Sequence, residues 1–140
     1  MAADGAAAWI TTTAERWTDE TDAEWAVVAD ADLVGRVALR GVDLAVGQGE
    51  VSYWTSPEAR GRGVASDAVQ RVASWALDTV GFWRLEIRYP VENPASCRVA
   101  LLAGFAEEAR LARQHLHEDG WHDVHVHRRL RVAEPTVTSA

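Results

Sequence analysis

A glycine-rich turn between a strand-like segment and a helix-like segment constrains the fold of this chain more than any other feature. The turn is Arg60-Gly61-Arg62-Gly63-Val64-Ala65-Ser66. From residue 64 to residue 80, apolar and small side chains recur at helical spacing until Gly81 interrupts them. Residues 50–55, Glu-Val-Ser-Tyr-Trp-Thr, are typical of a strand. A strand, a glycine turn and the N-terminus of a long helix therefore follow one another directly.

The start of such a helix is suited to bind an anion. Its first backbone N–H groups lack partners and its dipole is positive there, and glycines let a phosphate approach the backbone closely. Arg60 and Arg62 add fixed positive charge. A dinucleotide fingerprint would need a third glycine where Ser66 stands, and a P-loop would need a lysine, which the chain lacks. Taken alone, the turn is equally consistent with an ordinary connection into a helix.

The remaining segments predict a single α+β domain over residues 1–140, with one long and one short helix. Hairpins are expected at Asp30-Ala31-Asp32 and Glu118-Asp119-Gly120. The strands are expected at residues 24–30, 33–40, 50–55, 83–89, 105–116 and 124–132, and the short helix at residues 95–103. We expect Trp54 and Trp75 to pack in the core, residues 5–20 to form a weak helix, and residues 1–8 and 134–140 to be loose.

Charge and composition exclude several classes of function. The net charge is −7, and all 14 basic residues are arginines. This balance disfavours a nucleic-acid-binding protein, which needs a basic face. We expect no membrane protein, because no apolar run is long enough for a span, and residues 1–8 lack the basic start of a signal peptide. The single Cys97 allows no internal disulfide and favours a reducing compartment, so a cytoplasmic location is expected.

The glycine turn and two further motifs resemble the GNAT superfamily of N-acetyltransferases, in the branch that contains the ribosomal-protein N-terminal acetyltransferases. The turn is similar to the Gln/Arg-x-x-Gly-x-Gly/Ala motif that binds acetyl-CoA in that superfamily, and Ser52–Pro57 resembles the strand leading into it. Asn93-Pro94-Ala95-Ser96, followed by Leu102-Ala103-Gly104-Phe105, resembles the Asn-x-x-Ser…Gly-Phe segment of the branch. The resemblance covers about residues 24–131.

The resemblance implies a mixed, mostly antiparallel sheet with flanking helices, in which two neighbouring parallel strands splay apart to admit acetyl-CoA. Here the pair would be residues 50–55 and 83–89. The pantetheine arm would pair with the edge of the first strand, and the pyrophosphate would bind the backbone N–H groups of the turn. The implied coenzyme-binding residues are Tyr53, Trp54, Thr55, Arg60, Gly61, Arg62, Gly63, Val64, Ala65, Ser66 and Asn93. Asn93 before Pro94 is also typical of a helix N-cap, and the two roles can coexist.

For catalysis, the resemblance implies Ser96 as the acid that protonates the leaving thiolate and Glu50 as the base that accepts the amine proton. Glu86 is the second candidate for the base. Each has a simpler interpretation as well. Ser96 would be tolerated in the first turn of any helix, Glu50 suits an exposed strand position, and Glu86 suits an ion pair with Arg84 or Arg88.

The last expected hairpin is rich in histidine. The residues are His115, His117, His122, His125 and His127. Alternate strand residues share a face and imidazoles bind zinc, but the resembled family uses no metal in its mechanism. We therefore expect pH-sensitive surface histidines and no metal cofactor. Cys97 is better explained as a small buried side chain than as a nucleophile.

The resemblance thus implies an enzyme that moves an acetyl group from acetyl-CoA to a primary amine by direct attack in a ternary complex. The implied acceptor is one of three kinds, a protein N-terminus, an amino acid or a small amine, and the sequence does not decide between them. The alternative is a non-catalytic acyl-CoA-binding or interaction module with an incomplete acceptor site, because relatives carry a further strand and helix before the part matched here. Residues 24–30 would then form a sheet edge, which residues 9–20 or a second chain could cover, and we expect a homodimer.

Overall fold

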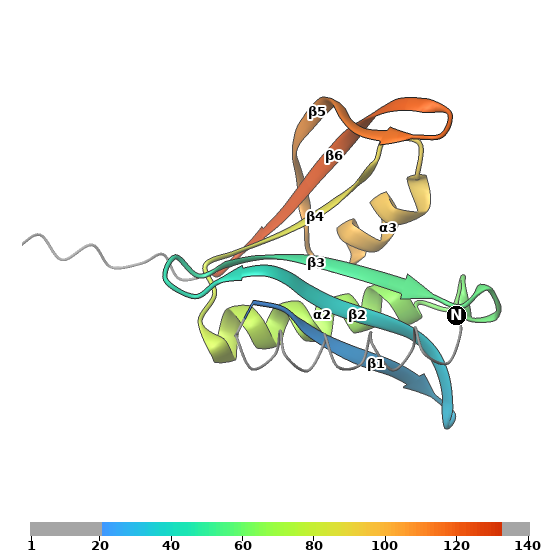
Figure 1. The fold of residues 1–140 in the computed structure, drawn as a ribbon. Coiled ribbons are helices and arrows are strands. Elements are labelled where there is room, and N and C mark those ends of the chain that lie inside the picture. The colour runs from blue at the N-terminus through green and yellow to red at the C-terminus, as the bar shows by residue number, and fades with distance from the viewer. Residues whose placement is uncertain (1–20, 133–140) are drawn as a thin grey trace, which may run out of the picture.

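The computed structural model describes residues 21–132 and contains one six-stranded sheet with two helices that share its hydrophobic core (Figure 1). The strands are β1 (Ala23–Ala29), β2 (Asp32–Asp43), β3 (Gln48–Thr55), β4 (Arg84–Pro90), β5 (Ala106–His117) and β6 (Gly120–Leu130). The helices are α2 (Val64–Ser74), which continues as a π-helical turn over Trp75–Val80, and α3 (Pro94–Leu102), and a 3₁₀ turn covers Pro57–Ala59. In the described part of the chain, no helix combines the length and hydropathy that crossing a membrane requires.

The strand order is β1-β2-β3-β4-β6-β5, and every neighbouring pair is antiparallel except β3 and β4. This arrangement confirms the predicted α+β class with a mostly antiparallel sheet. The β1–β2 turn places Asp30 and Ala31 at positive φ, which matches the twist of the flanking strands. The predicted edge position of β1 is also confirmed within residues 21–132.

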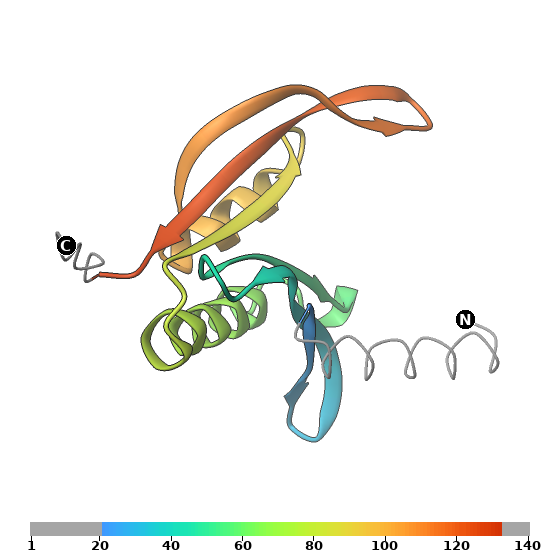
Figure 2. The same ribbon diagram turned by 60° about the vertical axis from the view of Figure 1, so that its left-hand side comes forward.

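The parallel pair β3 and β4 is joined over only a short length. The paired residues are Gln48 with Arg84, Gly49 with Leu85 and Glu50 with Glu86. Beyond that point β3 stays with β2 up to Thr55, whereas β4 stays with β6 up to Pro90. Figure 2 shows the two halves of the sheet fanning apart. Within residues 21–132, the facing backbone edges of residues 51–55 and 87–90 therefore have no strand partner, as the predicted splay requires.

The core lies between the sheet and the two helices. Val69 and Ala73 of α2 are fully buried, as the apolar stripe predicted, and they join Leu85 and Ile87 of β4 in one cluster. Gly81 ends the helical segment at φ 102°. Residues 1–20 and 133–140 lie outside the described residues, and with them the predicted helix at 5–20 and the segments expected to be loose.

The prediction for two tryptophans is wrong. The exposed fractions of Trp54 and Trp75 are 51% and 40%, so neither belongs to the core. Side chains alternate along β3, and since Val51 and Tyr53 face the helices, Trp54 faces the opposite side. Trp75 lies where α2 gives way to the π-helical turn, and its ring packs edge-on against Trp25 with centroids 5.5 Å apart.

Candidate functional site

A cleft of about 590 Å³ opens where β3 and β4 diverge, between the N-terminus of α2 and one face of α3. It is lined by Tyr53, Trp54, Thr55, Ala59, Arg60, Gly61, Gly63, Val64, Ala65, Ser66, Asn93, Ala95, Ser96, Arg98, Val99 and Leu102. Among the residues implied as coenzyme-binding, only Arg62 is missing from this lining. Its guanidinium turns away and donates a hydrogen bond to the Glu58 carbonyl at 3.0 Å.

The glycine turn forms the floor of the cleft because two of its residues adopt left-handed backbone conformations. Gly61 has φ 79°, and Gly63, the N-cap of α2, has φ 73°. A side chain at either position would strain the backbone. The first N–H in α2 with an intrahelical partner belongs to Asp67, which donates to the Gly63 carbonyl at 3.0 Å. The N–H groups of residues 64–66 precede the helical hydrogen-bond pattern, as expected for a helix start, and lie at the cleft.

The cleft is positively charged in a chain whose net charge is −7. Arg60 and Arg98 are the charged residues of its lining, which includes no acidic residue. Neither guanidinium has an ion-pair partner among residues 21–132. Two unpaired arginines beside a helix N-terminus can bind a ligand that carries several negative charges.

Sequence reasoning missed Arg98 and the apolar wall next to it. Ala95, Arg98, Val99 and Leu102 all lie on the cleft side of α3. Their spacing of three, four and seven residues is that of one helix face. That spacing could have identified them once Ser96 had been assigned to the cleft.

Asn93 and Ser96 occupy the first turn of α3. The Asn93 side-chain carbonyl accepts a hydrogen bond from the Ser96 backbone N–H at 3.1 Å, and Pro94 takes the first helical position. Asn93 is therefore an N-cap, and it lines the cleft at the same time. The Ser96 hydroxyl has no capping role, because the cap uses its backbone.

Tyr53 brings a second hydroxyl to this region. Burial raises the pKa of its phenol, and the nearby Ser96 side chain partly offsets that effect. The two hydroxyls are close but do not meet the geometry of a hydrogen bond, so the buried Tyr53 oxygen is unpaired among the described residues. A buried polar atom without a partner is costly unless a ligand or water pairs with it.

The predicted base Glu50 lies in a different hollow of about 290 Å³. This hollow is lined by Arg40, Gly41, Gln48, Gly49, Glu50, Arg84, Glu86 and Arg88. Strand alternation turns Glu50 to the face opposite Val51, which packs in the core shared with the helices. The structure therefore does not bring Glu50 and Ser96 into one pocket, but places them on two sides of the point where β3 and β4 diverge.

The charges around Glu50 are already paired with one another. The Arg40 guanidinium contacts Glu24 at 2.9 Å and donates to the Ser52 hydroxyl at 3.0 Å. The Glu86 carboxylate forms ion pairs with two guanidinium groups, with Oε1 2.7 Å from Arg84 Nη2 and Oε2 3.1 Å from Arg88 Nη2. Glu50 has neither an ion pair nor a hydrogen bond of its own within residues 21–132.

These contacts give the two candidate bases opposite properties. Burial raises the pKa of Glu50 above its ordinary value, although the charge of Arg88 partly opposes it. Burial would also raise the pKa of Glu86, but the hydrogen bonds from Arg84 and Arg88 outweigh it and hold that pKa below the ordinary value. Glu50 is therefore the better proton acceptor, since its carboxylate is both unpaired and more basic.

A small polar group on the inner side of α3 contains the buried Tyr89 and His127 and the partly buried Cys97. The Tyr89 hydroxyl lies 2.8 Å from His127 Nδ1, and the Cys97 thiol lies 3.9 Å from Nε2. Burial lowers the pKa of His127, which keeps the imidazole neutral. A neutral imidazole does not stabilise a thiolate as a cation would, which agrees with the interpretation of Cys97 as a packed side chain.

Comparison with known proteins identifies the family and the fold of this chain. A family model described as an acetyltransferase (GNAT) domain matches residues 1–106. A putative ribosomal N-acetyltransferase of Bacillus subtilis is 28% identical over 107 residues, which are 76% of this chain and 58% of that protein. A ribosomal-protein-serine acetyltransferase of Escherichia coli is 26% identical over 104 residues, 74% of this chain and 58% of its own length. This chain thus spans less than two thirds of the length of both relatives.

Solved structures share the fold. A probable acetyltransferase superposes with a TM-score of 0.82 at 24% identity, over 87% of this chain and 69% of the other. A variant of the spermidine N-acetyltransferase of Vibrio cholerae superposes with a TM-score of 0.79 at 20% identity, over 86% of this chain and 72% of the other.

Proposed function

The chain belongs to the family of GNAT acetyltransferase domains, and on that premise we propose that it transfers an acetyl group from acetyl-CoA to a primary amine. One observation carries the proposal. A positively charged cleft free of acidic residues, with a helix N-terminus as its floor, opens where the parallel strands diverge. Acetyl-CoA is a polyanion with a long amide-containing arm, and the cleft offers a partner for each part.

The two ends of the cleft suit different parts of the coenzyme. The pyrophosphate binds the turn from Arg60 to Ala65, where backbone N–H groups and the Ser66 hydroxyl are close by. The pantetheine amides pair with the backbone edge of β3 at residues 51–55, which has no partner strand on that side in the described part of the chain. Asn93 then lies near the end of the arm that carries the acetyl group.

The acceptor amine approaches from the hollow that contains Glu50. Glu50 takes a proton from the ammonium group, directly or through water, because only the neutral amine can attack the thioester carbonyl. The nitrogen–carbon bond forms, and the nitrogen, which is positively charged after the attack, loses its second proton to water. The tetrahedral intermediate then collapses, and the carbon–sulfur bond breaks. The Ser96 hydroxyl gives its proton to the departing thiolate and regains one from solvent, with the Tyr53 hydroxyl as a second donor beside it.

The acceptor is a primary amine of a protein N-terminus, an amino acid or a small amine. The names of the similar proteins include ribosomal-protein and spermidine acetyltransferases. Both kinds of acceptor are amines that are protonated at neutral pH, and Glu50 is the unpaired carboxylate at which either could lose its proton.

Calorimetric titration with acetyl-CoA tests the coenzyme site. Gly63→Glu should abolish binding, because it puts a side chain and a negative charge into the anion site and strains a residue with φ 73°. Gly41→Glu is the matched control. Gly41 has φ 55° and open space around its Cα, but it lies in the other hollow, so binding should persist. Unchanged affinity in folded Gly63→Glu protein would refute the coenzyme site.

Thiol release from acetyl-CoA over a panel of peptides, amino acids and polyamines tests the reaction. Release that depends on an amine, with an N-acetylated product detected by mass spectrometry, supports acetyl transfer. Tight binding of acetyl-CoA without turnover of any amine would instead support the alternative of a non-catalytic acyl-CoA-binding module.

A further inference from the structure

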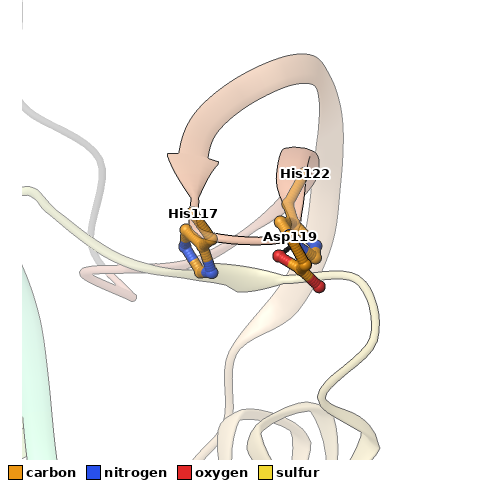
Figure 3. A group of neighbouring side chains, drawn as sticks. All are labelled: His117, Asp119 and His122. Carbon is orange, nitrogen blue, oxygen red and sulfur yellow. Dashed lines mark hydrogen bonds and ion pairs between the residues drawn. The ribbon is translucent and has the colours of Figure 1, made fainter.

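Three side chains at the tip of the β5–β6 hairpin converge in a way that the proposed acetyl transfer does not use. His117 ends β5, Asp119 lies in the turn, and His122 follows near the start of β6 (Figure 3). Each offers one atom, an imidazole nitrogen or a carboxylate oxygen, and these atoms all lie within 4.8 Å of one another.

Strand register explains the convergence. His115 and His122 are directly opposite each other, so His117, two residues after His115, points to the same face as His122. The ring centroids of His117 and His122 are 4.5 Å apart. Gly120 at φ 118° follows the short turn, which holds the Asp119 Oδ1 atom 2.6 Å from His122 Nε2.

A carboxylate outside the trio lies beside the His122 ring. The Nδ1 atom of His122 is 3.1 Å from Oε2 of Glu92, which belongs to the segment between β4 and α3, but the two atoms do not meet the geometry of a hydrogen bond. The His122 side chain is only 15% exposed. When one ring nitrogen is directed at a carboxylate, the other is left to face a metal ion, and histidine ligands commonly have such a partner.

We propose that His117, Asp119 and His122 form a Zn²⁺ site, with Glu92 as the residue that positions His122. Two imidazoles and one carboxylate are zinc ligands, with Zn–N distances of about 2.0–2.1 Å, and they leave the fourth tetrahedral position to water. His117 and Asp119 are exposed, so rotation about their side-chain bonds brings the three atoms to these distances. The ion would tie β5 to β6 and, through Glu92, to the segment that leads to Asn93 in the coenzyme cleft.

Calorimetric titration of the untagged full chain with Zn²⁺ at pH 7.5 tests the site, with Co²⁺ absorption in the visible range as an independent readout. We expect one ion per chain. His117→Gln, His122→Gln and Asp119→Asn should each abolish this binding, and Glu92→Gln should weaken it about 10- to 100-fold. His115→Gln is the matched control on the same face, and it should bind like the parent. Far-UV circular dichroism confirms that each variant is folded.

The site is independent of the acetyl-transfer proposal, because the readouts need neither acetyl-CoA nor an amine. Binding should also weaken as the pH falls, because protons compete with a metal ion for its ligands. Absence of saturable binding to the parent would overturn the proposal, and so would undiminished binding to the triple variant His117→Gln/Asp119→Asn/His122→Gln. A loss in His115→Gln equal to that in His117→Gln would overturn the assigned ligands.

Discussion

Glu50 and Glu86 are register partners in the last paired rung of β3 and β4, and only Glu86 is neutralised by arginines. Two carboxylates so close repel each other, and the negative charge of Glu86 helps to raise the pKa of Glu50. Arg84 and Arg88 stabilise the charged form of Glu86 and lower its pKa. Glu50 therefore retains an unpaired carboxylate with a raised pKa at the point where the strands diverge. This asymmetry distinguishes a structural acid from a candidate base.

Removing the Glu50 carboxylate should slow catalysis without affecting coenzyme binding. We expect Glu50→Gln to lower kcat by about 100-fold or more, the usual contribution of general base catalysis. In the parent, kcat/KM should decrease at pH values below the raised pKa of Glu50, because the base is protonated there. The variant should not show this decrease. The measurement is a pH series of steady-state rates for the parent and the variant. Calorimetric titration with acetyl-CoA checks that coenzyme binding is unchanged. An unchanged pH profile in the variant would assign the base elsewhere.

The same substitution should make the protein more stable at neutral pH. The native state holds the Glu50 proton more tightly than the unfolded chain does, because burial raises its pKa above 4.5. The free energy of unfolding therefore falls as pH rises from the unfolded pKa through the native one, and the cost is fully present only above the native pKa. Urea denaturation at pH 7 and pH 4 checks this. The free energy of unfolding of Glu50→Gln should be larger than that of the parent at pH 7, and the two should approach each other at pH 4. A variant less stable than the parent at pH 7 would contradict the expectation.

Arg98 should contribute to coenzyme affinity. Its guanidinium lines the cleft without an ion-pair partner among the described residues, so Arg98→Gln should weaken acetyl-CoA binding about 10- to 100-fold, which corresponds to the ~1.5–3 kcal/mol of a hydrogen bond to a charged group. Arg71→Gln is the control, because Arg71 is exposed on α2 and pairs with Asp67. Equal affinities in the two variants would show that Arg98 does not contact the coenzyme.

The hydroxyls of Ser96 and Tyr53 should act on turnover and not on coenzyme binding. Ser96→Ala leaves the N-cap of α3 intact, because the cap uses the backbone N–H of Ser96. We expect kcat to fall about tenfold or more with an unchanged dissociation constant for acetyl-CoA, as for a group that acts in the transition state. Tyr53→Phe should lower kcat less. If both variants keep the parent's kcat, water protonates the thiolate.

Much of the fold was predictable because its signals are local. The helical stripe after Gly63, the Asn93-Pro94 cap and the two hairpin turns depend on residues close in sequence, and the structure has all of them. The cleft followed from the resemblance of the glycine turn, and it contains all the implied coenzyme-binding residues except Arg62. Whether they bind the coenzyme is left to the titrations above.

What could not be predicted depends on contacts between distant segments. The difference between Glu50 and Glu86 arises from side chains on β3 and β4 that meet only through parallel pairing. His117, Asp119 and His122 are close in sequence, but their convergence also depends on the β5–β6 register, and the resemblance to a family without a catalytic metal favoured surface histidines there. Trp54 was misplaced because its strand faces a core on one side and a charged hollow on the other, and a hydrophobic side chain alone does not tell which face it takes.

The outer edge of β1 leads to a prediction about assembly. Within residues 21–132 no strand pairs with that edge, and Val28 and Leu33 near it are 61% and 67% exposed. Proteins rarely leave such an edge uncovered. The two candidate covers are residues 9–20, which lie outside the described residues, and a second chain. We expect the second chain, in a homodimer whose partner covers β1 and completes the wall of the acceptor site. Light scattering behind a sizing column should give about twice 15.3 kDa at micromolar concentration.

Substitutions near the edge test the interface. The double variant Val28→Asp/Leu33→Asp should dissociate the dimer and lower turnover. The control Leu116→Asp, at an equally exposed apolar site on the distant β5–β6 hairpin, should leave both the dimer and the turnover unchanged. A 15.3 kDa monomer that acetylates amines would refute the shared site while leaving the coenzyme cleft intact.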